Sequence, residues 1–109
     1  MNNKALFIEK AWKKHKETEN SQFIIYTNML VGHGINGIDT REYKDGSFIY
    51  DYIERRNHII SDIHFTEMGL IFHYIYQPNH QRDKKNLEWI DTNVYLPLES
   101  ITGAEVKEF

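Results

Sequence analysis

The spacing of apolar residues changes from a helical period to a strand period near residue 20. Over Lys4–Thr18, the side chains of Ala5, Ile8, Trp12 and His15 recur on one helical face, and lysines fill most of the remainder. Asn20 then offers a stop, because asparagine tolerates the left-handed conformation in which helices often end. The pattern therefore predicts an N-terminal helix that lies on a sheet, with Trp12 as its anchor.

From Gln22 onward the period is two, as in β-strands. Turn residues divide this part of the chain into the predicted strand runs Gln22–Val31, Ser47–Arg55, His58–Thr66, Leu70–Tyr76 and Glu88–Val106. A tight turn at Thr27–Asn28 is an open alternative that would split the first run. Pro97 cannot donate to a sheet ladder, so we expect a strand end there, then a single helical turn at 98–101 and a closing strand at Thr102–Val106.

The predicted class is α+β and predominantly β, in a single domain of residues 1–109. The N-terminal helix (1–20) packs on a curled antiparallel sheet or small open barrel of about six strands (21–109). Asn36–Gly37 predicts a hairpin, and Pro78–Asn86 predicts a polar loop. The glycines at 32, 34 and 37 match the letters of the dinucleotide fingerprint, but no long helix follows them, so we interpret them as hairpin residues.

The composition restricts the class of protein and its possible partners, but it does not identify an activity. The 109 residues contain no cysteine, which excludes disulfides and thiolate zinc sites and fits a reducing compartment. No apolar run has the length of a membrane span or a secretory signal, so we expect a cytoplasmic protein with no membrane partner. The net charge is −3, from 13 Lys+Arg against 16 Asp+Glu, and the basic residues form no stripe. Nucleic acid is therefore the less favoured partner.

Catalytic and metal-binding residue types do not assemble into a recognisable set. Ser47, Ser61 and Ser100 lie outside any nucleophile-elbow motif. His64 and His73 could meet across the Glu67–Gly69 turn with Asp62 nearby, but the histidines lack metal-ligand spacing. We therefore expect no enzyme, no metal and no cofactor. A small metal-dependent hydrolase or ligand-binding barrel using those three residues stays open as an alternative.

The aromatic residues suggest a binding face, because tyrosine combines apolar area with a polar hydroxyl and aromatic residues are enriched at interfaces. The predicted surface combines Tyr50, Tyr52, Tyr74 and Tyr76 with His80 and Arg82 of the polar loop. The competing interpretation is that these rings fill the core. The resulting hypothesis is a non-catalytic accessory, inhibitory or immunity-type protein that binds another protein through an aromatic sheet face or edge. Self-association stays open.

Two segments resemble parts of Sm-like barrels. Phe23–Met29 followed by Gly32–Asp39 is similar to the first two strands of those domains. Val94–Gly103 is similar to their closing strand and turn, and also to those of bacterial PH-like domains. The resemblance implies an oligomeric RNA-binding barrel as an alternative function. The middle of the chain, Ser47–Asn86, is longer and more aromatic than a minimal Sm-like core, so no family is assigned.

Overall fold

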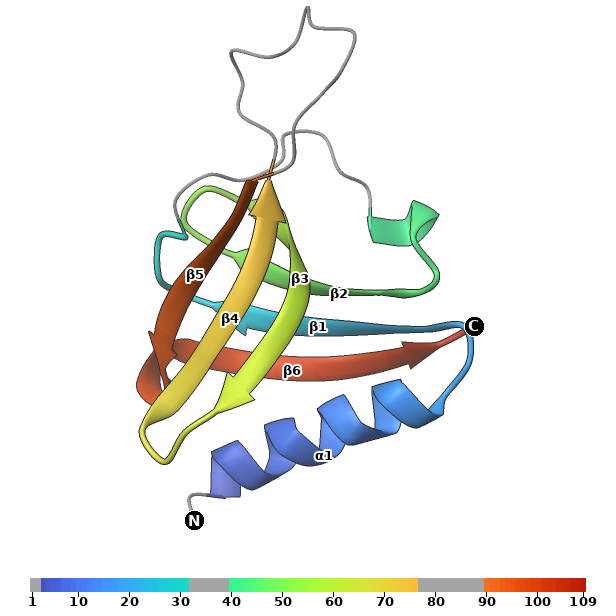
Figure 1. The fold of residues 1–109 in the computed structure, drawn as a ribbon, viewed down its shortest axis with the longest axis horizontal. Coiled ribbons are helices and arrows are strands. Elements are labelled where there is room, and N and C mark those ends of the chain that lie inside the picture. Colours follow the sequence, from blue (N-terminus) through green and yellow to red (C-terminus); the bar gives the residue numbers. More distant parts are fainter. Residues whose placement is uncertain (1–2, 32–39, 77–89) are drawn as a thin grey trace, which may run out of the picture.

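The computed structural model describes residues 3–31, 40–76 and 90–109. One helix packs on a six-stranded mixed sheet with the strand order β5-β4-β3-β2-β1-β6 (Figure 1). The elements are α1 (Asn3–Glu17), β1 (Ser21–Thr27), η1 (Thr40–Glu42), β2 (Gly46–Asp51), β3 (Arg56–Phe65), β4 (Gly69–Tyr76), β5 (Ile90–Pro97), η3 (Leu98–Ser100) and β6 (Ile101–Glu108). The predicted α+β class and curled sheet are confirmed, and the described strands do not close into a barrel.

One strand pair departs from the predicted antiparallel sheet. β1 and β2 are parallel neighbours, whereas the other pairs in the described sheet are antiparallel. The hairpin predicted at Asn36–Gly37 lies outside the described residues, and the two strands that flank it cannot be hairpin partners because they run in the same direction. Their carboxyl ends therefore meet, with Thr27 opposite Asp51.

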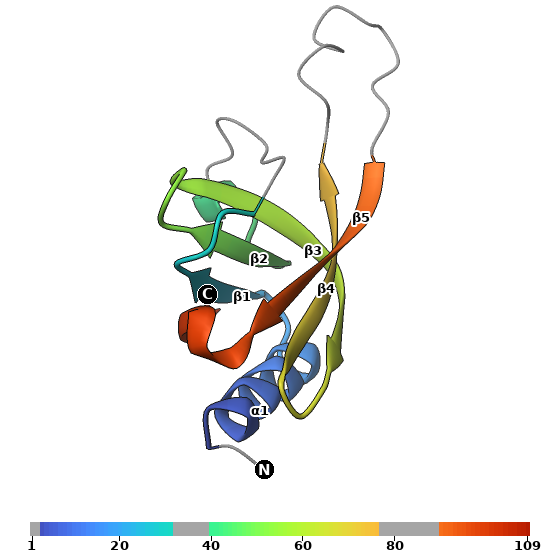
Figure 2. The ribbon, with the colours of Figure 1, turned by 90° about the vertical axis from the view of Figure 1, so that its left-hand side faces the viewer.

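The sheet curls sharply along β3. β1, β2 and β6 lie nearly along one axis, with β6 antiparallel to the other two, while β4 and β5 cross them steeply (Figure 1). The side view shows the resulting bend (Figure 2). β3 has ten residues and pairs with β2 near its start and with β4 along the rest. A register shift between Ile60 and Asp62 marks a β-bulge at Ser61. Bulges increase local twist, which accounts for the bend.

The inner face of the curl holds the main core, and α1 lies against it. Ala5 and Ile8 are buried, and the Trp12 ring meets Phe23 edge-on at a centroid distance of 5.2 Å. The helix thus uses the apolar stripe that the sequence predicts, with Trp12 as an anchor. The sheet contributes buried apolar side chains from all six strands, among them Ile25, Ile49, Ile60, Ile63, Leu70, Phe72, Leu96 and Ile101.

The outer face of β1 and β2 carries a smaller buried layer. Ile24 and Phe48 are directly opposite each other and almost fully buried, and the Tyr43 ring packs edge-on against Phe48. The Gln22 side-chain amide donates to the carbonyl oxygens of Thr40, in η1, and of Tyr43. This cover explains why β1 carries apolar residues on both faces.

The ends of the elements differ from the predicted ones by a few residues. β1 stops at Thr27, in agreement with the alternative of an early turn. β2 stops at Asp51, not Arg55, because residues 52–55 form a turn in which Arg55 has a φ of 55°. Asn20 has a φ of 53°, the left-handed conformation expected after the helix. No helix in the described ranges is long and apolar enough to cross a membrane.

Candidate functional site

Three tyrosines gather at the carboxyl ends of β1 and β2, and we call Tyr26, Tyr50 and Tyr52 the tyrosine cluster. Parallel pairing places Tyr26 directly opposite Tyr50. The backbone N–H of Tyr52 donates to the Thr27 carbonyl at 3.0 Å, which brings the third ring back over the first two. The ring centroids are 5.0–5.9 Å apart, with Tyr52 stacked on Tyr26 and edge-on to Tyr50. These separations are typical of favourable aromatic pairs.

The Tyr26 hydroxyl is held by an acidic neighbour. It donates a hydrogen bond to Glu105 on β6, and Lys107 lies 3.5 Å from the same carboxylate oxygen. Burial, and then the bond to Glu105, raises the pKa of Tyr26 well above its ordinary value. The phenol therefore remains protonated at neutral pH, and its ring orientation is fixed from β6.

The cluster borders an exposed apolar corner of the molecule. Tyr50 is half-buried, Tyr52 is 51% exposed, and the next residue, Ile53, is 60% exposed. Neighbouring rings hold Tyr52 in place, so it loses little conformational freedom when a partner covers it. An ordered aromatic surface that also carries phenolic hydroxyl groups is suited to contact with a protein.

The structure separates the other predicted site residues from this cluster. Tyr74 is only 5% exposed and packs edge-on against the His58 ring at 5.4 Å, so its assignment to the binding surface is wrong. Its side chain points to the core because β4 alternates with Phe72 and Tyr74 on the inner face. Tyr76 is the last residue of β4, and its side chain lies outside the described part, as do His80 and Arg82. Tyr50 and Tyr52 are thus brought together, and Tyr26 is the neighbour that sequence reasoning missed.

A buried polar pair lies beneath the same turn. His58 Nε2 is 2.9 Å from Asp51 Oδ2, and both side chains are fully buried. The other carboxylate oxygen of Asp51 accepts the Glu54 N–H at 2.8 Å, so Asp51 also closes the turn that carries Tyr52. Sequence reasoning treated His58 only as a strand histidine. The available signal was an aspartate at a strand end, seven residues before a histidine and separated from it by a turn.

A second histidine joins the helix to the sheet. His15 Nδ1 lies 2.8 Å from Ser21 Oγ, and its Nε2 lies 3.1 Å from Ser47 Oγ. The Ser21 hydroxyl also reaches the carbonyl oxygens of Thr18 and His15, which favours the tautomer in which Nδ1 donates and Nε2 accepts from Ser47. Burial and then the charge of Lys16 lower the pKa of His15, against a smaller opposite effect of Asp45.

This serine–histidine contact is best explained as a structural one. Ser47 is buried under α1, and a nucleophile needs an open approach for its substrate. The group on the far side of the imidazole is the Ser21 hydroxyl, whereas a hydrolytic triad places a carboxylate there. The network therefore pins α1 to the first residues of β1 and β2.

The residues of the metal alternative are only partly brought together. Asp62 and His73 are directly opposite on β3 and β4, whereas His64 is paired with Ile71. Across the three described ranges, no group of three or more His, Asp or Glu side chains is arranged to hold a metal ion.

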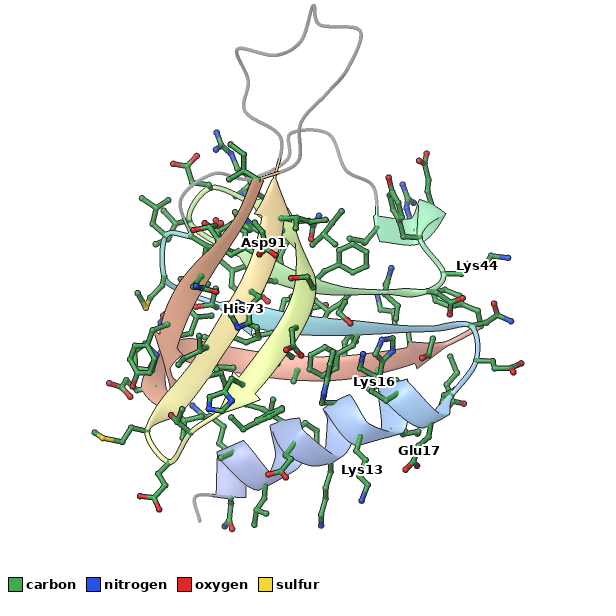
Figure 3. All side chains as sticks on the ribbon, in the orientation of Figure 1. Lys13, Lys16, Glu17, Lys44, His73 and Asp91 are labelled. Atoms are coloured by element: carbon green, nitrogen blue, oxygen red, sulfur yellow. The ribbon has the colours of Figure 1, made fainter. Side chains whose placement is uncertain are left out.

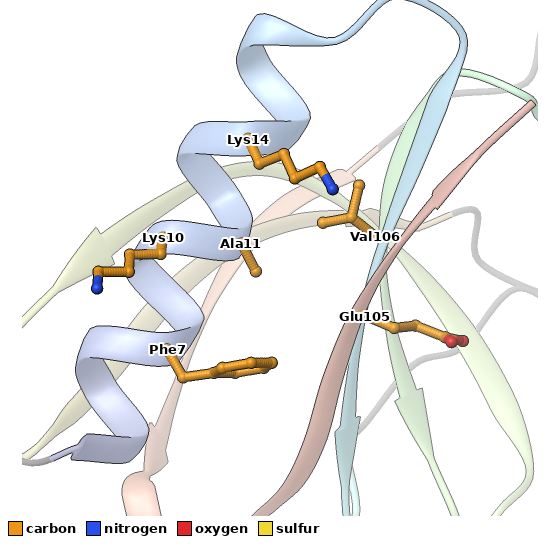
Figure 4. A pocket seen from close by; sticks show the side chains of 6 residues that line it. All are labelled: Phe7, Lys10, Ala11, Lys14, Glu105 and Val106. Atoms are coloured by element: carbon orange, nitrogen blue, oxygen red, sulfur yellow. The ribbon is translucent and has the colours of Figure 1, made fainter.

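A groove runs between α1 and the edge strand β6, and we call it the α1–β6 groove. Its two hollows, of about 330 and 210 Å³, share Phe7. One is lined by Phe7, Lys10, Ala11, Lys14, Glu105 and Val106 (Figure 4). The other continues along β6 through Ile101, Thr102, Gly103 and Ala104. Two of these β6 residues, Gly103 and Ala104, are small and line the same hollow as Phe7.

Comparison of the chain with protein-family models, with curated proteins and with solved structures finds no match.

Proposed function

We propose that this protein is a non-catalytic binding module that captures another protein through the tyrosine cluster and the adjoining Ile53. The observation that carries the proposal is the mutual packing of three tyrosines beside an exposed isoleucine at one corner of the sheet. Interface energy concentrates in a few aromatic anchors surrounded by apolar contacts, and this corner supplies both.

The surrounding charge supports a protein partner over a nucleic acid. The chain carries a net charge of −3, and Glu105 lies against the cluster at the Tyr26 hydroxyl. A phosphate backbone would be repelled by this carboxylate, whereas a protein partner can donate hydrogen bonds to it. An open sheet with two edges also differs from the closed ring-forming barrel that the Sm-like alternative requires. The cysteine-free composition fits the cytoplasm, which we include in the proposal.

Affinity capture with matched variants tests the proposal. Tyr52→Ala removes the most exposed ring of the cluster, and Tyr95→Ala removes a ring of similar exposure, 48%, from β5 at the opposite edge of the sheet. A hot-spot ring contributes about 2 kcal/mol or more to binding, so Tyr52→Ala should lower the affinity for the captured partner about thirtyfold. Tyr95→Ala should leave its affinity unchanged. Equal retention of the partner by both variants would remove the cluster from the binding surface.

A further inference from the structure

The strand β6 offers a free sheet edge beside the α1–β6 groove. In the described sheet β6 is the terminal strand and pairs only with β1. On the side away from β1, alternate residues of this eight-residue strand have backbone groups without a strand partner, as in every edge strand. In Figure 4, Val106 points toward the helix and Glu105 points to the other side of the strand. An extended chain laid along this edge would therefore place alternate side chains into the groove.

The groove combines an apolar floor with lysines. Phe7 is 61% exposed although its neighbours Ala11 and Val106 are apolar, so its ring is an uncovered hydrophobic surface. Lys14 pairs with Glu108 at 3.3 Å between two exposed side chains, an interaction that costs little to exchange. Lys10 forms no ion pair with any described residue. A ligand that fits must be apolar at one point and anionic at another.

The relative direction of α1 and β6 sets the order in which a bound segment passes the groove residues. Lys4 Nζ donates to the Ile101 carbonyl and Lys14 pairs with Glu108, so α1 and β6 run in the same direction. Groove residues on α1 recur every three or four positions, or about 4.5–6 Å, and alternate residues of a strand recur about every 6.6 Å. An extended segment along β6 would therefore run past Phe7 first, then past Lys10 and Lys14.

We propose that the α1–β6 groove binds an extended acidic segment of a partner protein, which adds to β6 as a seventh strand. Its inward positions carry an apolar side chain opposite Phe7 and carboxylates opposite Lys10 and Lys14. This site goes beyond the tyrosine cluster and does not depend on it, because it lies on the helix side of β6, whereas Glu105 meets Tyr26 of the cluster on the other side of that strand.

The helix charge selects this occupant over a second copy of the chain. α1 carries five lysines against two glutamates. Antiparallel pairing of β6 with β6 of another copy, about a two-fold axis perpendicular to the sheet, would bring two such helices to the same face of the joined sheet. The lysines of two such neighbouring helices would repel each other, whereas an acidic strand is attracted to the same lysines.

A synthetic peptide tests the site directly. The probe is acetyl-Thr-Val-Thr-Glu-Thr-Glu-Thr-amide with a fluorescent label, together with the reversed sequence, because strands add in either direction. The control peptide has lysine in place of both glutamates. Fluorescence anisotropy should show at least tenfold tighter binding of one acidic peptide than of its lysine counterpart. Equal affinities would overturn the proposal.

Matched charge reversals on the helix locate the binding. Lys10→Glu changes a groove residue, whereas Lys13→Glu makes the same charge change on the side of α1 that faces away from the sheet (Figure 3). Lys10→Glu should lower the affinity for the acidic peptide at least tenfold and raise the affinity for the lysine peptide. Lys13→Glu should change either affinity by less than twofold. Equal effects of the two variants would indicate a general charge attraction and overturn the site.

Two further measurements separate strand addition from other occupancy. N-methylation of alternate peptide nitrogens removes the donors needed for a ladder and should abolish binding; undiminished binding overturns the strand geometry. Light scattering of the protein alone should give a monomer mass. A dimer that the peptide fails to dissociate would show a second copy on β6 and overturn the proposal. The peptide contains no aromatic residue and does not probe the tyrosine cluster. Failure of the peptide to bind would therefore overturn the groove site without contradicting the proposed function.

Discussion

Replacement of Asp51 by alanine is the most informative test of how the turn under the tyrosine cluster is held. The two carboxylate oxygens of Asp51 have separate partners, the imidazole of His58 at 2.9 Å and the backbone N–H of Glu54 at 2.8 Å. Both side chains of the Asp51–His58 pair are fully buried, so water cannot replace the lost contacts without opening the core. The substitution therefore leaves two polar groups without their carboxylate acceptor.

The magnitude follows from these two bonds. Hydrogen bonds to charged groups contribute about 1.5–3 kcal/mol each, and removal of one member of a buried pair costs about 3–5 kcal/mol. Both energy ranges indicate that the free energy of unfolding falls by several kcal/mol, against a total of about 5–15 kcal/mol for a domain. For a chain of this length, 3 kcal/mol corresponds to a fall in melting temperature of at least about 12 °C.

Urea unfolding followed by circular dichroism measures the effect. The midpoint for Asp51→Ala should fall by about 1 M or more, given the usual slopes of about 1–3 kcal/mol per molar urea. Asp51→Asn should lose less, because the amide oxygen can still accept the Glu54 N–H. Asp91→Ala, at an exposed position on β5, is the control and should stay close to the wild type. If Asp51→Ala and Asp91→Ala unfold at the same urea concentration, the buried pair is not a major source of stability.

Three further predictions concern other parts of the fold. In Gly69→Ala the new Cβ would lie 2.5 Å from the Leu96 carbonyl oxygen, so thermal unfolding should show a loss of roughly 1–3 kcal/mol; an unchanged melting temperature contradicts the close approach. Burial lowers the pKa of His15, so the unfolded chain takes up its proton first, and the unfolding free energy should fall as pH drops below about 6.5. His15→Gln should flatten part of that decline, and an identical pH profile would contradict the assignment. Burial and Glu105 raise the pKa of Tyr26, so one tyrosine should ionise well after the others in an alkaline absorbance titration, and Glu105→Gln should bring it closer to them.

The secondary structure could be read from the sequence because it depends on local periodicity. The stripe Ala5, Ile8, Trp12 and His15 predicts a helix over Lys4–Thr18, and the helix occupies Asn3–Glu17. The break at Pro97, with a short helical turn and a closing strand after it, is also confirmed. These features require only that each segment bury one face, which the spacing of apolar residues encodes.

Features that depend on partners distant in sequence could not be read in this way. Strict alternation on β3 predicts that Ile59, Ser61 and Ile63 share a face. The bulge at Ser61 breaks this pattern, so that His58 and Ile60 before it and Ile63 after it are buried. The parallel pairing of β1 with β2 is equally hidden, because crossover connections usually contain a helix.

The candidate site also combines features that the local sequence predicts with features that depend on distant strand partners. The sequence predicts Tyr50 and Tyr52 as two members of a larger surface, and these two rings pack together in the structure. Tyr26 was missed because only the parallel register brings β1 beside β2 at that point. Tyr74 was misassigned because alternation shows that two sets of side chains face opposite ways, but not which set meets the core.

Hydrogen-exchange footprinting of the complex with the captured partner tests the central claim most directly. If the tyrosine cluster is the protein-binding surface, amides of the turn at 52–55 and of the ends of β1 and β2 should exchange more slowly in the complex than in the free protein. Amides of β5 should exchange at the same rate in both states. Protection confined to β5, with no change around Tyr52, would contradict the account.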